Sequence, residues 1–210
     1  MKIKYVFLAI ALFMLSFGSL LAQESSVGIK GGINFANMSV DGSNDENLKM
    51  GLMFGVFNKI PINESFAIQP ELMYSSKGVK INYDDEAFIE GESKFKLSYI
   101  DVPVKLVFNL SEDFEFQFGP YVGYLLSAGF ENDGSIAGID VNSEDEIDRD
   151  NFNPWEFGLT GGLGFDFDPL VIGFSYNMGL SQVAKDDEPS ELMLGEAKNS
   201  VIQVYAGIKF

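Results

Sequence analysis

Apolar and polar positions alternate along residues 114–126, and this alternation is the most informative pattern in the chain. Large apolar residues, four of them aromatic, take every other position of the run, and the positions between include Glu115, Gln117, Gly119 and Gly123. Successive side chains of a strand point to opposite faces, so the segment has one apolar face and one face of small or polar groups. A soluble barrel would place the apolar face inside. A phenylalanine-rich face opposite glycine, glutamate and glutamine instead predicts a strand whose outer face contacts lipid.

Seven further segments are candidate strands. Together with the segment at 114–127, the eight ranges in chain order are 27–37, 49–60, 66–76, 94–109, 114–127, 154–167, 170–181 and 199–210. The third, sixth and seventh repeat the same inverted alternation, whereas the second is apolar on both faces and its register is ambiguous. The fourth changes phase near Tyr99, because its large apolar residues switch from odd to even positions; a β-bulge there would explain the change.

The connections between these segments alternate in length. Three are short: residues 60–65, residues 110–113 and the corner at Asp168 and Pro169. The stretches 38–48, 77–93, 129–153 and 182–198 are long, and they hold 21 acidic and 5 basic residues. A lipid-facing band cannot carry those charges. The pattern predicts an all-β fold, an eight-stranded antiparallel up-and-down transmembrane β-barrel, with acidic extracellular loops at one end and short periplasmic turns at the other.

The N-terminal segment has the features of an export signal. Lys2 and Lys4 precede an apolar run from residue 5 to residue 21, and Ala22 offers a small residue at a cleavage site. We expect residues 1–22 to be a signal peptide and residues 23–210 to be one outer-membrane barrel domain. The run is also long enough for a transmembrane helix, which is the alternative.

The last candidate strand ends on an aromatic residue. Every second position before it is apolar, and together with the last residue the set is Ile202, Val204, Ala206, Ile208 and Phe210. A C-terminal aromatic on an alternating strand is typical of the insertion signal of outer-membrane barrels. The expected partners are therefore outer-membrane lipid and, during biogenesis, the barrel-assembly machinery.

Composition excludes several classes of function. The chain has no Cys and no His, so thiol chemistry, a Ser-His-Asp triad and His-bearing zinc sites are excluded. Removal of Lys2 and Lys4 with the signal lowers the formal charge from −17 to −19, a field that disfavours nucleic acid. We predict that the protein is not an enzyme and that it holds no cofactor.

Several stretches resemble the PorT-like, or porin-family, outer-membrane β-barrel proteins of the Bacteroidetes type. They are the runs 28–38, 68–78, 97–106, 118–126 and 157–167, of which the Gln-Pro-Glu-Leu run beginning at Gln69 and the Ile-Asp-Val-Pro run beginning at Ile100 are the most specific. The resemblance covers almost the whole chain after residue 22. It implies an eight-stranded outer-membrane barrel and implies little about activity, because that family is defined by its fold.

Seven charged residues are predicted to face the lumen: Lys30, Glu71, Asp101, Lys105, Glu115, Glu156 and Lys209. Buried charges need partners, so this lumen polar cluster is expected to be structural and to fill the interior of a small barrel. An ion or proton path is the alternative.

Two other stretches suggest ligand sites. The acidic residues Asp140, Glu144, Asp145, Glu146, Asp148 and Asp150 could hold a weak divalent cation, although their spacing is not that of an EF-hand and a solvated loop is the simpler interpretation. The glycine-rich run at 160–164 lacks the lysine and the following helix of a phosphate loop, so it is better explained by the strong coiling of a strand.

The leading interpretation is an outer-membrane barrel with a structural or interaction role in the envelope. The first alternative is a narrow channel or a secretion-linked transport component, although eight strands leave little lumen. The second is a soluble lipocalin-like binding barrel, which requires the opposite facing of the apolar residues.

Overall fold

The computed structural model describes residues 25–39, 48–85, 89–136, 139–185 and 195–210. The predicted signal peptide, residues 1–22, lies outside the described residues. Over the described ranges the elements are nine strands and one 3-10 turn. They are β1 (Ser26–Ser39), β2 (Lys49–Asn63), β3 (Phe66–Asp85), β4 (Ile89–Asn109), β5 (Phe114–Ile136), β6 (Ile139–Ile147), η1 (Arg149–Asn151), β7 (Trp155–Phe167), β8 (Leu170–Gly179) and β9 (Lys198–Lys209). A search of the described helices finds none long and apolar enough to cross a membrane.

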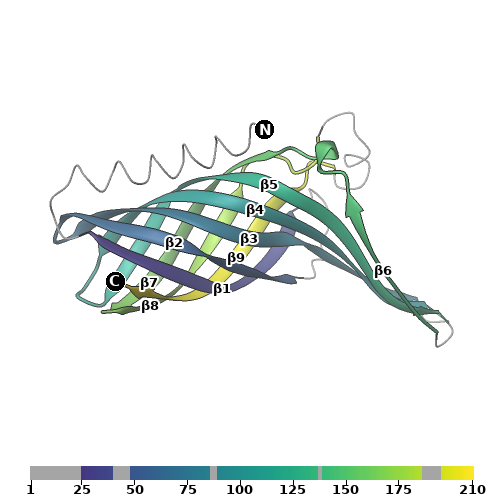
Figure 1. Cartoon of the computed structure of the whole chain (residues 1–210), viewed down its shortest axis with the longest axis horizontal. Coiled ribbons are helices and arrows are strands. Elements are labelled where there is room, and N and C mark those ends of the chain that lie inside the picture. Colours follow the sequence, from purple (N-terminus) through teal and green to yellow (C-terminus); the bar gives the residue numbers. More distant parts are fainter. Residues whose placement is uncertain (1–24, 40–47, 86–88, 137–138, 186–194) are drawn as a thin grey trace.

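Eight of these strands close into a ring in the order β1, β2, β3, β4, β5, β7, β8, β9 (Figure 1). All of the pairings are antiparallel, and the first and last strands join from Gly28 opposite Lys209 to Ser39 opposite Lys198. The predicted eight-stranded antiparallel barrel is therefore confirmed. Closure leaves no unpaired strand edge within the ring, which is what a barrel in lipid requires.

One end of the barrel has short turns, as the sequence predicted. Two residues join β2 to β3, four join β4 to β5, and Asp168 and Pro169 join β7 to β8. The C-terminus lies at this end (Figure 1). We call it the short-turn end and the opposite end the long-hairpin end.

The long-hairpin end differs from the prediction. The stretches 77–93 and 129–153 were expected to be loops, but β3 and β4 pair as far as Asp85 opposite Ile89, and β5 pairs with β4 as far as Ile136. A ninth strand, β6, pairs with β5 from Ala128 opposite Ile147 onward. These parts of β3, β4, β5 and β6 form a projecting sheet that extends well beyond the ring (Figure 1). Acidic and other polar residues interrupt the apolar alternation in these parts of the strands, so periodicity reveals them less clearly than the barrel strands.

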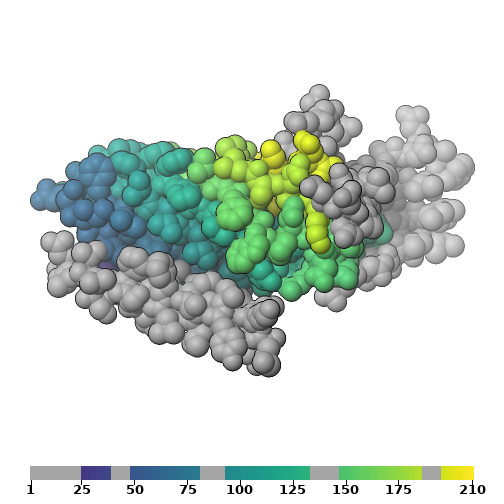
Figure 2. Space-filling view, turned by 90° about the horizontal axis from the view of Figure 1, so that it is seen from above, coloured from purple at the N-terminus to yellow at the C-terminus, as the bar shows by residue number. Residues whose placement is uncertain are grey.

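Large apolar side chains cover the outside of the barrel, and this wall is closely packed in the view of Figure 2. The ambiguous second strand shows the rule: Leu52, Phe54 and Val56 are exposed on the outside, whereas Met53 and Phe57 are buried inside. Met53 packs there against Met73 and Tyr205. Such facing contradicts the soluble lipocalin-like alternative, which needs its apolar residues inside.

The change of phase that the sequence predicted for the fourth strand is absent from the structure. Phe95 and Leu97 face inward with Tyr99 and are buried, so the odd positions of β4 from Ser93 to Val107 face the lumen. The ladder does shift by one residue at this level, but the additional residue lies on β5: Ser98 pairs with Ser127, and Tyr99 pairs with Leu125. The apolar residues at 95 and 97 misled the prediction because they close the lumen rather than face lipid.

Candidate functional site

We call the part of the lumen nearer the short-turn end its lower half and the part nearer the long-hairpin end its upper half. The polar side chains of the lower half are arranged around the Glu71 carboxylate. Lys30 Nζ donates a 2.7 Å hydrogen bond to Glu71 Oε1, Gln69 Nε2 donates a second of 2.8 Å, and Lys105 Nζ lies 3.1 Å from the same oxygen. The Lys30 ammonium also lies 4.4 Å from the centre of the Tyr205 ring. Three donors and an aromatic face compensate the burial of these charges, as burial requires.

A continuous series of polar contacts runs from this group to the short-turn end. Lys105 donates to Gln117 (3.2 Å), Gln117 donates to Glu115 (2.6 Å), and Lys59 bridges Glu115 (2.6 Å) and Asp166 (3.0 Å). Lys209 then pairs with Asp166 at 2.5 Å. A cavity of about 10 Å³ lies among these groups, which is room for about one water molecule. The contacts fill the lower lumen and leave no wide aqueous path between the described residues.

The upper half of the lumen is organised around Lys77. Its ammonium donates to Asp101 (3.0 Å) and Glu156 (3.1 Å) and lies over the rings of Tyr99 and Tyr121. Glu156 accepts two further hydrogen bonds, from Tyr121 Oη (2.5 Å) and Asn199 Nδ2 (3.0 Å). Between the two halves, Asn34 donates to Ser75 and accepts from Gln203, which accepts in turn from Ser175.

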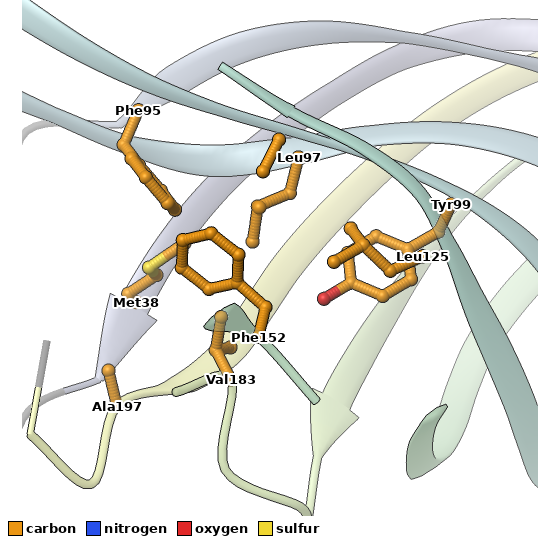
Figure 3. Close-up of a cluster of buried hydrophobic side chains, with 9 residues drawn as sticks. Met38, Phe95, Leu97, Tyr99, Leu125, Phe152, Val183 and Ala197 are labelled. Atoms are coloured by element: carbon orange, nitrogen blue, oxygen red, sulfur yellow. The ribbon is translucent and has the colours of Figure 1, made fainter. Parts of the chain in front are cut away.

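An apolar plug closes the lumen above Lys77. Its buried members are Met38, Phe95, Leu97, Tyr99, Leu125, Ala128, Phe152, Val183 and Ala197. Phe152 lies among the side chains of the wall in Figure 3, with its ring centre 5.4 Å from that of Phe95. Phe152 and Val183 come from the connections before β7 and after β8, so the plug is made partly by segments folded over the opening.

Backbone and amide hydrogen bonds hold these two connections together. Phe152 and Ala184 form an antiparallel bridge, and Asn153 N donates to Val183 O. Asn153 Nδ2 donates to Gln182 O (3.1 Å) and Ala184 O (2.7 Å). Five residues, all in stretches that the sequence pattern assigned to loops, thus hold this part of the apolar plug over the lumen.

Glycines make room for the large residues of the lumen. A Cβ placed on Gly158 would lie 2.3 Å from the Tyr121 ring, and one placed on Gly28 would lie 2.4 Å from the Phe57 ring. Each glycine therefore permits a ring to lie flat against the neighbouring strand. The glycine-rich run at 160–164 lies within β7, a strand, which agrees with its predicted role in strand coiling.

All seven residues predicted for the lumen polar cluster lie in these networks. Lys30, Glu71, Asp101, Lys105, Glu115 and Glu156 are buried, and Lys209 is partly buried near the short-turn end. They are divided between the two halves of the lumen. The predicted insertion-signal residues Ile202, Val204, Ala206, Ile208 and Phe210 all face outward on or just after β9.

Sequence reasoning missed several members of the lumen networks. Lys77 was placed in a loop, although it continues the odd-numbered inward positions of β3 that include Glu71 and Ser75. Lys59 and Asp166 were not assigned to the lumen. The register of the second strand was ambiguous, and Asp166 is the penultimate residue of β7. Extending the alternation by one position beyond residue 76 would have found Lys77.

The acidic stretch offers no described cation site. The backbone of residues 140–146 forms most of β6, but these side chains lie outside the described residues. Asp148 and Asp150 are exposed, and Asp148 accepts a hydrogen bond from Asp150 N at the start of η1. A search of the described Asp and Glu side chains finds no group of three that could hold a metal ion.

Among solved structures, the chain is similar to several outer-membrane proteins at low sequence identity. The Ail protein of Yersinia pestis is 16% identical, with 90% of this chain and 100% of that chain covered and a TM-score of 0.47. Neisserial surface protein A is 13% identical over 90% and 100% of the two chains, with a TM-score of 0.48. OprG of Pseudomonas aeruginosa is 14% identical over 90% and 98%, with a TM-score of 0.36.

No curated protein sequence matches the chain. Residues 21–185 match the family model described as outer membrane protein beta-barrel domain. This match covers more than three quarters of the sequence, and the closed barrel with its apolar exterior is the structure that such a protein needs. The chain belongs to the outer membrane protein beta-barrel domain family, and it is an outer-membrane protein.

Proposed function

We propose that this protein is a closed, non-catalytic barrel that anchors an interaction surface, the projecting sheet, on the outside of the outer membrane. The observation that carries the proposal is the state of the lumen, which is filled by ion pairs and closed by the apolar plug. A barrel filled in this way is an anchor rather than a passage. The alternative of a narrow channel would need these networks and the plug to open together.

The orientation follows from charge. The four long connections of the sequence hold 21 of its 31 acidic residues, and two of these connections, residues 77–93 and 129–153, contribute to the projecting sheet. Barrels of this kind have long connections outside the cell and short turns on the periplasmic side. The projecting sheet is therefore assigned to the cell exterior and the short-turn end to the periplasm.

The outer edge of the sheet is suited to contact with another chain. Within the described residues β6 has a single strand neighbour, β5, so its other edge presents backbone donors and acceptors. An extended segment can add to such an edge through main-chain hydrogen bonds. Envelope or extracellular components with an extended, basic segment would suit the acidic composition of residues 139–147.

Several finer assignments belong to the same proposal. Within the family, we place the chain among the PorT-like proteins of the Bacteroidetes type, on the motifs quoted above, and we transfer no role in secretion. Residues 1–22 act as a cleaved signal peptide. The barrel-assembly machinery recognises the outward-facing residues at the end of β9. Divalent cations bind only weakly at the acidic stretch.

Single cysteines test the orientation directly, because the native chain has none. Asp148→Cys is exposed at the long-hairpin end, and Ser111→Cys is the matched position in the β4–β5 turn. With a membrane-impermeant maleimide on intact cells, we expect labelling of the variant at position 148 only. The variant at position 111 is labelled once the outer membrane is permeabilised. The opposite pattern would place the projecting sheet in the periplasm and end the proposal.

A further inference from the structure

The outer wall of the barrel has a hollow at the seam where the first and last strands meet. The hollow has a volume of about 600 Å³, and its lining residues belong to β1, β2, β8 and β9 and are almost wholly apolar. This volume is within the range of ligand pockets, about 300–1,000 Å³. Lys30 is the one charged residue of the lining, but its side chain is buried in the lumen on Glu71, so only its backbone borders the hollow.

The register of the strands explains the hollow. Residues in register across these strands form rungs, and two neighbouring outward rungs border the hollow: Leu170–Ile208–Ile29–Val56 and, one step farther from the short-turn end, Ile172–Ala206–Gly31–Phe54. The first rung is large at all four positions, whereas the second has its two smallest residues side by side in the middle. A Cβ placed on Gly31 would have Met53 O, at 3.5 Å, as its nearest neighbour, so this position is uncrowded. The result is an oblique groove between large apolar side chains, which we call the seam groove.

The depth of the seam groove in the bilayer follows from the second rung. This rung runs round the whole ring, from Phe114 at the start of β5 back to Tyr124 on the same strand. Its ends are ten residues apart, which at about 3.3 Å per residue and a tilt of about 40° is roughly 25 Å of the barrel axis, the height of a lipid-facing band. Ala206 and Gly31 are the third and fourth of its eight steps, so they lie near the middle of the band. Leu170 lies near the short-turn end, and the groove therefore spans the depth of one leaflet.

An occupant of the seam groove must be apolar, narrow and about one leaflet long. The groove crosses three strand spacings, or roughly 14 Å. The wall around it faces hydrocarbon, as the exposed side chains of Phe54 and Ile208 show. An acyl chain of a phospholipid meets each of these conditions. Because the groove surrounds such a chain on more than one side, the chain makes more dispersion contacts there than against a convex part of the wall.

We propose that the seam groove binds one acyl chain of a phospholipid from the leaflet at the short-turn end. The carbons near the headgroup lie beside Leu170 and Ile208, and the methyl end lies beside Gly31 and Phe54. The bound chain covers the seam at which β1 and β9 close the ring, so it adds contacts to both terminal strands. The proposed orientation makes this the periplasmic leaflet, but the site itself requires only that this wall faces lipid.

Photolabelling of the folded protein in lipid vesicles tests the site. The probe is a phosphatidylethanolamine with a diazirine near either the carbonyl or the methyl end of one acyl chain, and mass spectrometry maps the labelled residues. Val104 and Leu106 on β4 are the reference, because they are as exposed, at 43% and 47%, as Val56 and Ile208 in the groove, at 43% and 46%. We expect labelling of the groove to exceed that of the reference about fivefold, a ratio that corresponds to ~1 kcal/mol. The methyl-end probe should label mainly near Gly31, and the carbonyl-end probe mainly near Ile208.

Gly31→Leu fills the groove and should reduce its labelling to the reference level. Gly161→Leu is the matched control: a Cβ on Gly161 is also uncrowded, with Phe118 at 3.6 Å, but this glycine of β7 does not line the groove. The control should leave the labelling unchanged, and heat-modifiable mobility on gels in SDS verifies that each variant is folded.

Equal labelling of the groove and the reference, or an equal loss in Gly161→Leu, would overturn the site. A dimer cross-linked through Ala206→Cys by a bismaleimide in the same vesicles would place a second copy in the groove and would overturn it as well. Cysteine labelling at positions 148 and 111 reports the orientation separately, so failure of this site and failure of the proposed orientation are told apart.

Discussion

Lys77 Nζ lies 3.0 Å from the Asp101 carboxylate in the upper lumen, and both side chains are almost fully buried. With Glu156, this group carries a formal charge of −1, whereas Lys30, Lys105 and Glu71 below carry +1. Lys59 and Lys209 balance Glu115 and Asp166 at the short-turn end. The charges of the lumen networks therefore cancel over the length of the barrel, although neither central group is neutral by itself.

Removal of Lys77 should be costly. We expect Lys77→Met to lower the free energy of unfolding by about 3–5 kcal/mol, because it leaves two buried carboxylates without their shared cation. Reversible unfolding in urea, in lipid vesicles, measures the change. Adding Asp101→Asn restores the formal neutrality of the lumen, so the double variant should recover at least half of the loss. A single variant as stable as the native protein would show that these charges are not paired.

A lysine on the lipid-facing wall should also destabilise the barrel. Phe118 is 44% exposed on the outside of β5, midway along its outward residues between Phe114 and Tyr124. Phe118→Lys should lower the free energy of unfolding by about 2–4 kcal/mol, the cost of a lysine at the bilayer midplane. Ser111→Lys, in the exposed β4–β5 turn, should change it little. Equal effects of the two substitutions would mean that the outer wall does not contact lipid as assigned.

Two glycines of β7 should differ in their tolerance of alanine. A Cβ on Gly158 meets the Tyr121 ring at 2.3 Å, whereas a Cβ on Gly161 has Phe118 at 3.6 Å as its nearest neighbour. We expect Gly158→Ala to cost about 1–3 kcal/mol, as overpacking does, since the ring must move and its hydrogen bond to Glu156 is disturbed. Gly161→Ala should be neutral or slightly stabilising. Folded yields and urea midpoints of the two variants in the same vesicles give the comparison.

The inverted alternation was sufficient to predict the barrel strands. Residues 66–76 and 170–179 place most of their large apolar side chains outside, with Met73 and Val171 as the inward exceptions, because one face meets lipid and the other a crowded, largely polar lumen. Periodicity failed in the projecting sheet. Its strands are rich in acidic and other polar residues, and periodicity alone did not distinguish them from acidic loops.

For the lumen networks, the sequence predicted which charged side chains face inward but not which of them form pairs. Charged residues such as Glu71 and Lys105 lie at alternate positions of strands whose other positions are apolar, so their odd numbering shows that they face the lumen. Their partners could not, because pairing between distant strands depends on register: Lys59 and Asp166 are 107 positions apart in the chain. The plug was missed for another reason. Phe152 and Val183 lie in irregular connections, and nothing in their local sequence shows that these fold over the lumen.

Single-channel recording in planar bilayers tests the central claim, that the lumen is closed, most directly. The native protein, shown by heat-modifiable mobility to be folded and inserted, should give no current steps above the bare bilayer. Phe152→Ala should stay silent as well, because the Lys77 and Glu71 networks fill the lumen below the plug. Reproducible, voltage-stable steps from the native protein would contradict the account and would favour a narrow channel.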